Sequence, residues 1–277
     1  MRSGHSLIGG HYTATNDSIY ASFYYMETGR MVKGRKPVAA GGAPETALSI
    51  GLGIGVSANS LIRHGLDVDV AEIDPVVYQY ARDYFGLPEP RRVFIDDGRR
   101  VLERAEDASY DYVLHDVFTG GSVPKQLFSL EALQEIRRVL KPDGVLTLNY
   151  VGMFNGSEAR ATWSVWRTLR EVFPHVASYK QAPEVTDGII NAVFIASALP
   201  IELRDWEEGD YLDGDMRYFA FTKMAECKLA DPDANMLATA SVVTDANNPL
   251  DTWQWLTASE HWKTMRSVLP LTFWLNY

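Results

Sequence analysis

The stretch that decides the fold is Leu48-Ser49-Ile50-Gly51-Leu52-Gly53-Ile54-Gly55, an apolar run that ends in three closely spaced glycines. Residues 46–51 predict a short buried strand, and residues 56–64 predict the helix that follows it. Glycines directly after a strand allow a tight turn and let the backbone approach a ligand closely. Such a turn also occurs for packing alone, so this motif needs support from the rest of the chain.

The spacing of the glycines separates two kinds of ligand. A dinucleotide fingerprint reads G-x-G-x-x-G and would place its third glycine at position 56, which is Val56 here. The observed G-x-G-x-G spacing is more typical of proteins that bind a nucleoside sulfonium. This spacing disfavours a nicotinamide-dependent oxidoreductase, which we keep as the weaker alternative function.

Strand-like and helix-like segments alternate along the middle of the chain. This rhythm predicts an α/β fold with a mostly parallel sheet covered by helices on both faces. The last two strands suit an antiparallel pair. The expected strands are 46–51, 68–73, 92–95, 110–114, 145–151, 176–180 and 189–196, and the expected helices are 56–64, 75–85, 99–105, 130–140 and 158–173.

Acidic residues end the second and third predicted strands. In open α/β sheets, ligands bind at the carboxyl ends of the strands. Glu72 follows Gly51 by about 20 residues, where an acid accepts hydrogen bonds from a ribose diol. Asp96-Asp97-Gly98 ends the third strand, where an acid can accept a hydrogen bond from an adenine amino group. Helix capping is the alternative reading for Asp97 and for Asp74.

The fourth strand ends in His115-Asp116. Side chains alternate across a strand, so only one of the two faces the cleft. We expect Asp116, at the mouth, to be the functional residue and His115 to be a packing residue. The segment 119–126 is rich in small residues, which suits a lid over the site.

These segments resemble the spermidine/spermine synthase family, which shares its core with class I S-adenosylmethionine-dependent methyltransferases. The resemblance covers roughly residues 5–275 and is greatest to a synthase-like branch common in fungi, in which several relatives carry membrane segments ahead of this region. The chain begins almost inside the motif region, as a short member or an excised domain would. The residues that carry the resemblance are the glycine turn, 72–77, 80–85, 96–99, 110–116, 127–129 and 245–250.

The resemblance implies a Rossmann-like class I methyltransferase fold with seven strands, an N-terminal β-hairpin part, and S-adenosylmethionine or its decarboxylated form as donor. It also implies roles for individual residues. The donor would be lined by Gly51, Gly53, Gly55, Glu72, Ile73, Asp97, Gly98, Asp116 and Val117. Asp116 matches the family's proton acceptor and is our catalytic candidate. Tyr20 and Thr119 occupy acceptor-side positions of the family, and no metal is implied.

Three departures from the family pattern bear on the acceptor. Aminopropyltransferases usually carry an acid where this chain has Ile54, a second acid where it has Thr119, and Tyr-His where it has Tyr20-Ala21. Those acids hold the cationic amines of the donor tail and the polyamine, and losing one leaves a buried ammonium unpaired. The sequence therefore favours methyl transfer to an amine or another small nucleophile. Aminopropyl transfer and a non-catalytic adenosine-binding scaffold remain the alternatives.

The composition of the chain limits which partners, metal sites and compartments are expected. The chain has 277 residues, 26 basic and 36 acidic side chains and a net charge of −10, which argues against nucleic acid as a partner. Its only cysteine, Cys227, excludes a disulfide within the chain and a cysteine-built zinc site. No apolar stretch is long enough to span a bilayer, and we expect a cytoplasmic protein. A homodimer would be in keeping with the family.

The chain divides into three expected parts. Residues 1–45 form an N-terminal region in which the aromatic-rich segment 18–32 predicts one or two β-hairpins. Residues 46–200 form the donor-binding core. Residues 201–277 form a C-terminal extension, in which four of the seven tryptophans fall within the last 25 residues. We expect a helical layer packed on the core there, and a dimer or membrane surface is the alternative.

Overall fold

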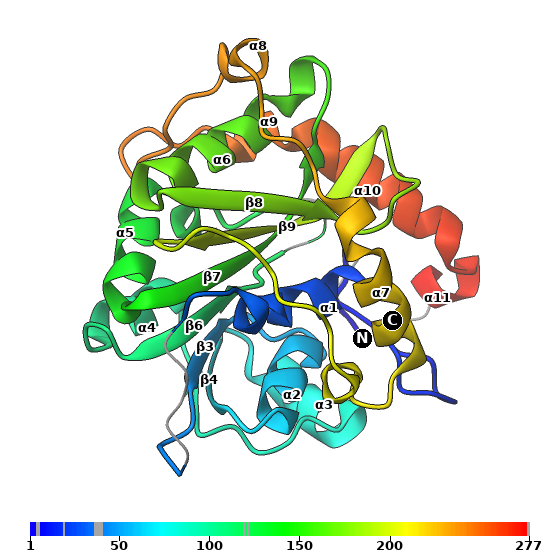
Figure 1. The fold of residues 1–277 in the computed structure, drawn as a ribbon. Coiled ribbons are helices and arrows are strands. Elements are labelled where there is room, and N and C mark those ends of the chain that lie inside the picture. The colour runs from blue at the N-terminus through cyan, green and yellow to red at the C-terminus, as the bar shows by residue number, and fades with distance from the viewer. Residues whose placement is uncertain (4–5, 19, 36–40, 119, 121, 276–277) are drawn as a thin grey trace.

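One seven-stranded sheet organises the molecule, in the order β5-β4-β3-β6-β7-β9-β8 (Figure 1). This is a computed structural model, and it describes residues 1–3, 6–18, 20–35, 41–118, 120 and 122–275. Strands β5, β4, β3, β6 and β7 run parallel, and β9 is antiparallel to both β7 and β8. The strands are β3 (Thr46–Ile50), β4 (Asp67–Glu72), β5 (Arg92–Ile95), β6 (Tyr110–His115), β7 (Leu140–Met153), β8 (His175–Lys180) and β9 (Ile189–Ser197).

Helices cover both faces of this sheet, and a separate hydrophobic cluster fills the space under each layer. The first layer holds α4 (Gly98–Arg104), α5 (Leu130–Val139), α6 (Arg160–Val172), α8 (Ala234–Leu237) and α9 (Leu250–Trp253). The second holds α1 (Ser22–Tyr25), η1 (Met26–Met31), α2 (Val56–Arg63), α3 (Pro75–Phe85) and α7 (Asp215–Lys223). Short 3-10 turns are η2 (Lys125–Leu127), η3 (Ser157–Ala159), η4 (Glu208–Tyr211) and η5 (Met224–Cys227), and the chain continues through α10 (Trp255–Val268) into α11 (Leu271–Leu275). The α/β class, the parallel sheet and the antiparallel last pair are confirmed.

The N-terminal region differs from its prediction. A hairpin is present, but it consists of the two-residue strands β1 (Arg2–Ser3) and β2 (Ser6–Leu7). Within the segment 18–32, predicted as hairpins from its aromatic content, residues 22–31 instead form α1 and η1. Tyr24 and Tyr25 are almost fully buried there, and the hydroxyl of Tyr25 donates to the carbonyl of Ala220 on α7. Aromatic residues favour strands only weakly, and burial against the sheet and α7 overrides that preference.

The regions before and after the core meet each other. Val32 pairs with Leu203 in an isolated antiparallel bridge, and the amide of Lys33 donates to the carbonyl of Glu202 at 2.8 Å. Both end regions therefore pack on the same sheet as the core. The division into 1–45, 46–200 and 201–277 stays a prediction. Within the described part of the chain, no helix is long and apolar enough to cross a membrane.

A buried ionic cluster ties the second helical layer together. The carboxylate of Glu27 on η1 is fully buried and pairs with Arg217 on α7. Its Oε2 lies 3.1 Å from Nε2 of His64 and 3.7 Å from Nε of Arg30. The guanidinium of Arg217 also donates to Oγ of Ser60 on α2 at 2.7 Å. One carboxylate thus joins three segments that are far apart in the sequence.

Replacing Glu27 by alanine will lower the free energy of unfolding by about 3–5 kcal/mol, because Arg217 would remain buried without its partner. Urea denaturation measures this change. Glu226→Ala is the matched control, since Glu226 forms an exposed pair with Lys223 and should cost about 0–1 kcal/mol. An equal loss of unfolding free energy in the two variants would show that the buried cluster stabilises the protein no more than an exposed ion pair does.

Candidate active site

Four strands present one row of residues at the carboxyl edge of the sheet. The register pairs Ile50 with both Ala71 and His115, and it pairs His115 with Leu148. The next residue on each strand therefore falls at the same level. That row consists of Gly51 after β3, Glu72 on β4, Asp116 after β6 and Asn149 on β7.

The glycine turn has the backbone that its sequence requires. Gly51, Gly53 and Gly55 all have positive φ, at 81°, 58° and 84°. A Cβ on Gly51 would lie 2.1 Å from the carbonyl oxygen of Asp116 and 3.1 Å from Cγ1 of Val117. The turn therefore packs directly against the chain that leaves β6, which only a glycine permits.

Glu72 supports the turn from the neighbouring strand. Its Oε2 accepts a hydrogen bond from the amide of Leu52 at 3.0 Å, and its Oε1 accepts one from the amide of Asp74 at 2.9 Å. Burial raises the pKa of this carboxyl, and the backbone hydrogen bonds lower it. Each carboxylate oxygen has two acceptor sites, so both oxygens can also receive a ribose hydroxyl.

The acids after β5 have separate tasks. The carboxylate of Asp96 pairs with Arg104, while Asp97 caps α4 by accepting from the amide of Arg99 at 2.7 Å. The capping alternative thus holds for Asp97, as it does for Asp74 on α3. Both roles are compatible for Asp97, since its cap uses one carboxylate oxygen.

The two remaining donor candidates near β4 and β5 are apolar. The side chain of Ile73 is 69% exposed directly after Glu72, where it can contact a bound nucleoside. Gly98 is buried at the start of α4, and a Cβ there would lie 2.5 Å from Cγ2 of Ile50. Gly98 therefore lets α4 approach β3 closely, whatever it does for a ligand.

Asp116 is the chemically distinctive member of the row. Its Oδ1 accepts a hydrogen bond from Nδ2 of Asn149 at 2.8 Å. Burial raises the pKa of Asp116 to about 6; the Asn149 hydrogen bond opposes this rise, and the nearby Glu72 charge adds to it. A carboxylate with this pKa remains mostly ionised at pH 7 and can accept a proton more readily than a solvated aspartate.

His115 is a packing residue, as predicted. Its Nε2 lies 2.9 Å from the carbonyl oxygen of Leu127, and its ring makes an edge contact with Phe128 at 4.6 Å between centroids. Burial lowers its pKa to about 4, so the ring is neutral at pH 7. His115 therefore takes no part in proton exchange at the cleft.

The acceptor-side candidates are only partly described. Tyr20 is half-buried, and its hydroxyl contacts Sδ of Met265 on α10 at 3.3 Å. Thr119 lies outside the described residues, as does Gly121 of the proposed lid. Tyr20 as an acceptor contact therefore stays a prediction.

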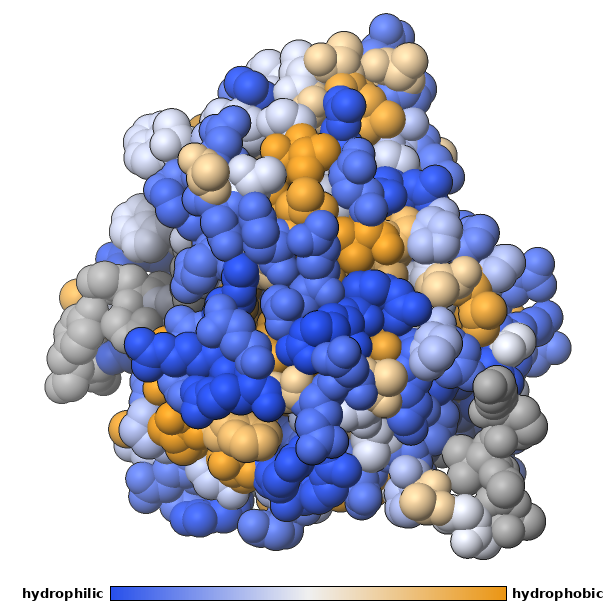
Figure 2. Space-filling view, turned by 90° about the vertical axis from the view of Figure 1, so that its left-hand side faces the viewer, coloured by the Kyte–Doolittle hydropathy of each residue, from blue (hydrophilic) through white to orange (hydrophobic). Residues whose placement is uncertain are grey.

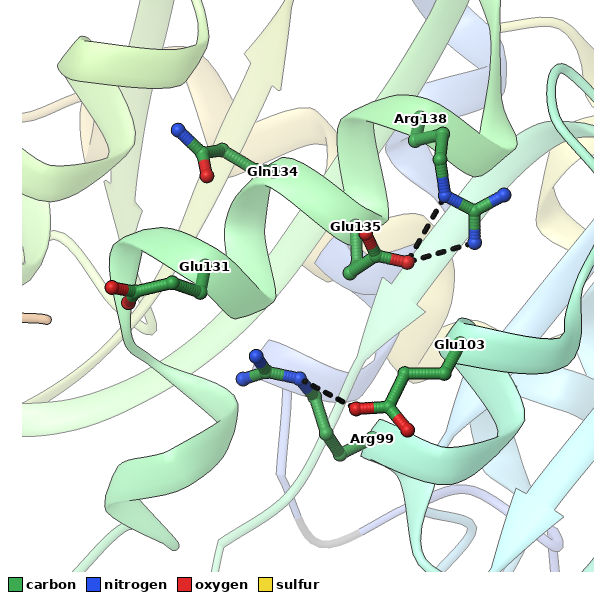
Figure 3. A pocket seen from close by; sticks show the side chains of 6 residues that line it. All are labelled: Arg99, Glu103, Glu131, Gln134, Glu135 and Arg138. Carbon is green, nitrogen blue, oxygen red and sulfur yellow. Dashed lines mark hydrogen bonds and ion pairs between the residues drawn. The ribbon is translucent and has the colours of Figure 1, made fainter. Parts of the chain in front are cut away.

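A charged surface hollow lies between α4 and α5 (Figure 3). Both of its arginines are paired within it, Arg99 with Glu103 and Arg138 with Glu135. Figure 2 views the molecule from the side where α4 and α5 lie, and hydrophilic residues dominate that face. We assign the candidate site to the strand edge, where the half-buried carboxylate of Asp116 lies in one row with Gly51 of the glycine turn. The residues lining the hollow are Arg99, Glu103, Glu131, Gln134, Glu135 and Arg138.

Sequence comparison decides the family. The model of a family described as "Spermine/spermidine synthase domain" matches residues 30–200, more than half of the chain. This chain belongs to the spermine/spermidine synthase family. The resemblance drawn from the glycine turn and the strand-end acids is confirmed.

Curated relatives of this spermine/spermidine synthase family member fall into two reaction classes. The chain is 36% identical to an N-terminal histidine N-methyltransferase of Emericella nidulans, over 99% of this chain and 53% of the relative. It is 30% identical to a polyamine aminopropyltransferase of Vibrio vulnificus, over 74% of this chain and 69% of the relative. The chain thus spans about half the length of the first relative.

Solved structures of the family share the fold. A probable spermidine synthase from Corynebacterium glutamicum superposes with a TM-score of 0.59 at 21% identity, covering 79% of this chain and 83% of the other. A spermidine synthase from Thermotoga maritima gives a TM-score of 0.52 at 19% identity, covering 78% of this chain and 74% of the other. The expected seven-stranded fold is confirmed.

Sequence reasoning missed the partner of Asp116. Asn149 lies within the apolar run of β7 and is buried. A polar residue inside such a run is a signal, because buried polar groups need partners. The sequence did not show which partner it meets, since that depends on the pairing of β6 with β7.

Proposed function

We propose that this chain transfers a methyl group from S-adenosylmethionine to a nitrogen atom, and that the acceptor is the N-terminal histidine of a polypeptide. The observation that carries the proposal is the hydrogen-bonded Asp116–Asn149 pair, in which Asn149 is buried and Asp116 half-buried, in the residue row that includes Gly51 of the glycine turn. The acceptor class is suggested by the Emericella nidulans relative, which matches nearly the whole chain.

The donor tail supports methyl transfer over aminopropyl transfer. Decarboxylated donor carries an ammonium at the end of its tail, which needs a carboxylate partner when buried. Ile54 occupies the position where aminopropyltransferases place that carboxylate, and it is only 4% exposed. Its side chain packs 3.1–3.4 Å from the Cβ position of Gly9. An apolar, buried side chain at this position cannot form an ion pair or a hydrogen bond with the aminopropyl ammonium.

The chain's own residues supply orientation and a proton acceptor. When bound, the donor supplies an electrophilic methyl on a sulfonium, and its carbon–sulfur bond breaks with the electron pair going to sulfur as the nitrogen–carbon bond forms. Positive charge therefore moves onto the acceptor nitrogen group. The ionised Asp116 carboxylate can accept an N–H of that group, which orients its lone pair, and then remove the proton. Asn149 fixes the carboxylate while this happens.

Mass spectrometry with both donors tests the proposal. A peptide that begins with histidine should gain one methyl group with S-adenosylmethionine. The same peptide beginning with alanine should remain unchanged, and so should either peptide with the decarboxylated donor. Fragmentation distinguishes the imidazole from the α-amine as the site.

Three outcomes would favour the competing functions. Aminopropyl transfer to putrescine or spermidine from the decarboxylated donor alone would establish the synthase reaction, which the Vibrio vulnificus relative represents. Absence of micromolar binding by either donor or its thioether product in calorimetry would favour a scaffold. Binding of a nicotinamide dinucleotide instead would favour an oxidoreductase.

A further inference from the structure

Asn149 is a buried polar residue in a mainly apolar stretch of β7. It is 3% exposed, and its neighbours Leu148 and Tyr150 are fully buried. Its Nδ2 donates to Oδ1 of Asp116 at 2.8 Å, but its own Oδ1 has no hydrogen-bond partner among the described residues. A buried acceptor without a partner lowers the stability of the fold, because it loses its hydration and gains no bond in return. The packing of β7 alone therefore does not explain this amide.

The orientation of the Asn149 amide follows from the charge of Asp116. An ionised carboxylate can only accept hydrogen bonds, so the amide must turn its nitrogen toward Asp116. The amide oxygen then lies in a part of the interior where none of the described residues donates to it. The unpartnered oxygen is therefore a consequence of the contact with Asp116.

Thr147 illustrates the structural use of a polar residue on the same face of β7. Alternate residues of a strand share a face, so Thr147 and Asn149 point to the same side of the sheet. The hydroxyl of Thr147 donates to the carbonyl of Met26 on η1 at 2.7 Å, which ties the helical layer to the sheet. The hydrogen bond of Asn149 instead reaches Asp116, the residue that follows the neighbouring strand β6. The two polar residues of this face thus serve different partners.

Asp116 has few neighbours that stabilise its negative charge. It is half-buried and forms no ion pair with a lysine, arginine or histidine of the described part of the chain. The charged group that acts on it is Glu72, at the end of β4, whose negative charge disfavours the ionised form and raises the pKa of Asp116. The neighbouring His115 lies against Leu127, and burial keeps its pKa low, so it carries no charge at pH 7. The amide of Asn149 is thus the group that favours the carboxylate form.

We propose that Asn149 is a positioning residue that keeps the carboxylate of Asp116 ionised and in one orientation at neutral pH. This inference rests on the proposed methyl transfer and adds to it the control of the charge on the proton acceptor. A hydrogen bond to a charged group changes the pKa of that group by about one unit or more. Without the amide, the pKa of Asp116 would rise from about 6 toward neutrality, and part of the proton acceptor would be lost at pH 7.

A direct titration of Asp116 tests this role without any acceptor. Carbon-13 NMR of the Asp116 carboxyl group, assigned with the Asp116→Asn variant, measures its pKa. Asn149→Leu removes the amide and keeps the approximate size of the side chain, and we expect it to raise this pKa by about one unit. Asn149→Ala should have a similar effect, and it cannot overfill the site if leucine fits poorly.

Asn191→Leu is the matched control for the titration. The register pairs Asn191 on β9 with Val151, two residues after Asn149, so both amides lie on one face of the sheet. The Nδ2 of Asn191 donates to Oγ of Ser22 at 2.9 Å, and its Oδ1 is also without a partner among the described residues. This substitution removes the same kind of amide but no contact with Asp116, so the pKa of Asp116 should not change.

Activity and stability should separate in Asn149→Leu. The ratio of wild-type to variant kcat/KM for the histidine peptide should be about fivefold higher near pH 6 than near pH 8.5, where Asp116 is ionised in both proteins. The midpoint of urea denaturation should stay the same or rise, because the unpartnered oxygen is removed. Thr147→Val should lower that midpoint, because the carbonyl of Met26 loses its donor.

The titration and the pH profile can each overturn the inference. An unchanged pKa of Asp116 in both Asn149 variants would do so, as would an equal rise in Asn191→Leu. A loss of activity that is the same at every pH, together with a lower urea midpoint in Asn149→Leu, would show that Asn149 has only a structural role. If the wild-type protein methylates no histidine peptide but the pKa of Asp116 shifts as expected, the proposed function fails while the role of Asn149 stands.

Discussion

Replacing Asp116 by asparagine will reduce kcat about 10²- to 10⁴-fold, the range over which a positioned proton acceptor contributes. The amide keeps the size of the carboxylate, and its oxygen can still accept the 2.8 Å hydrogen bond from Asn149. The fold and the donor site are therefore preserved while the proton acceptor is lost. Single-turnover kinetics with S-adenosylmethionine and a histidine peptide measure the loss, and calorimetry should show nearly unchanged donor affinity.

The pH profile provides a second signature of Asp116. The pKa of this carboxyl is raised to about 6, so the proton acceptor is lost as the pH falls through that value. The acceptor nitrogen also protonates on the acidic side, with an imidazole pKa of about 6.5. Below both values, the logarithm of kcat/KM should fall with a slope of about 2 in the wild-type protein and about 1 in Asp116→Asn.

Asp83→Asn serves as the control for this prediction. Asp83 is an exposed residue of α3 that pairs with its neighbour Arg82, so the same chemical change there should leave the rate and the pH profile as they are. Wild-type turnover by Asp116→Asn, with an unchanged slope, would remove Asp116 from any proton role.

Replacing Gly51 by alanine will have the second large effect, on both stability and donor binding. A Cβ at this position would lie 2.1 Å from the carbonyl oxygen of Asp116, and φ is 81°. The left-handed backbone costs about 1–2 kcal/mol for a residue with a side chain, and the overlap adds about 1–3 kcal/mol. We expect unfolding free energy to fall by about 2–5 kcal/mol, and donor affinity to fall because Asp116 and the turn are forced apart.

Gly65→Ala isolates the backbone contribution. Gly65 has a similar φ of 83°, but no atom lies within 4 Å of a Cβ built on it. Its substitution should cost about 1–2 kcal/mol and leave donor binding unaffected. Urea denaturation and calorimetry on the two variants give the difference. Equal stability losses in the two variants, with normal donor binding in both, would mean that a Cβ at position 51 does not disturb the carbonyl of Asp116.

The donor side of the candidate site could be predicted because it depends on local sequence. The glycines need positive φ wherever this turn occurs, and an acid at the end of β4 or β5 lies at the carboxyl edge of any parallel sheet. Gly51, Glu72 and Asp97 therefore appear at that edge as the sequence predicts. Their contacts with a bound nucleoside remain predictions.

The position of α10 could not be predicted in the same way. His261 on this helix lies 145 positions after Asp116 in the chain, yet its ring contacts that of Phe118, and Gln254 at the start of α10 donates to the hydroxyl of Tyr150 on β7. Periodicity indicates that a helix has an inner face, but it does not say which strand end that face will cover. The sequence correctly predicted that the C-terminal extension is helical. It did not predict against which strands these helices pack.

The segment 18–32 shows the limit of residue preference. Its aromatic residues favoured strands, yet residues 22–31 are helical because Tyr24 and Tyr25 are buried against the sheet and α7. A preference of this kind is worth a fraction of what burying two aromatic side chains contributes, so packing decides.

By itself, the sequence determined the alternation of strands and helices, the glycine turn and the acids that follow it, because each of these is set by neighbours within a few residues. Only the tertiary structure decided that Asn149 meets Asp116, that Glu72 holds the turn, and that α10 lies beside both. Those contacts join residues far apart in the chain, and they are selected by the burial of side chains and the pairing of strands rather than by any local preference.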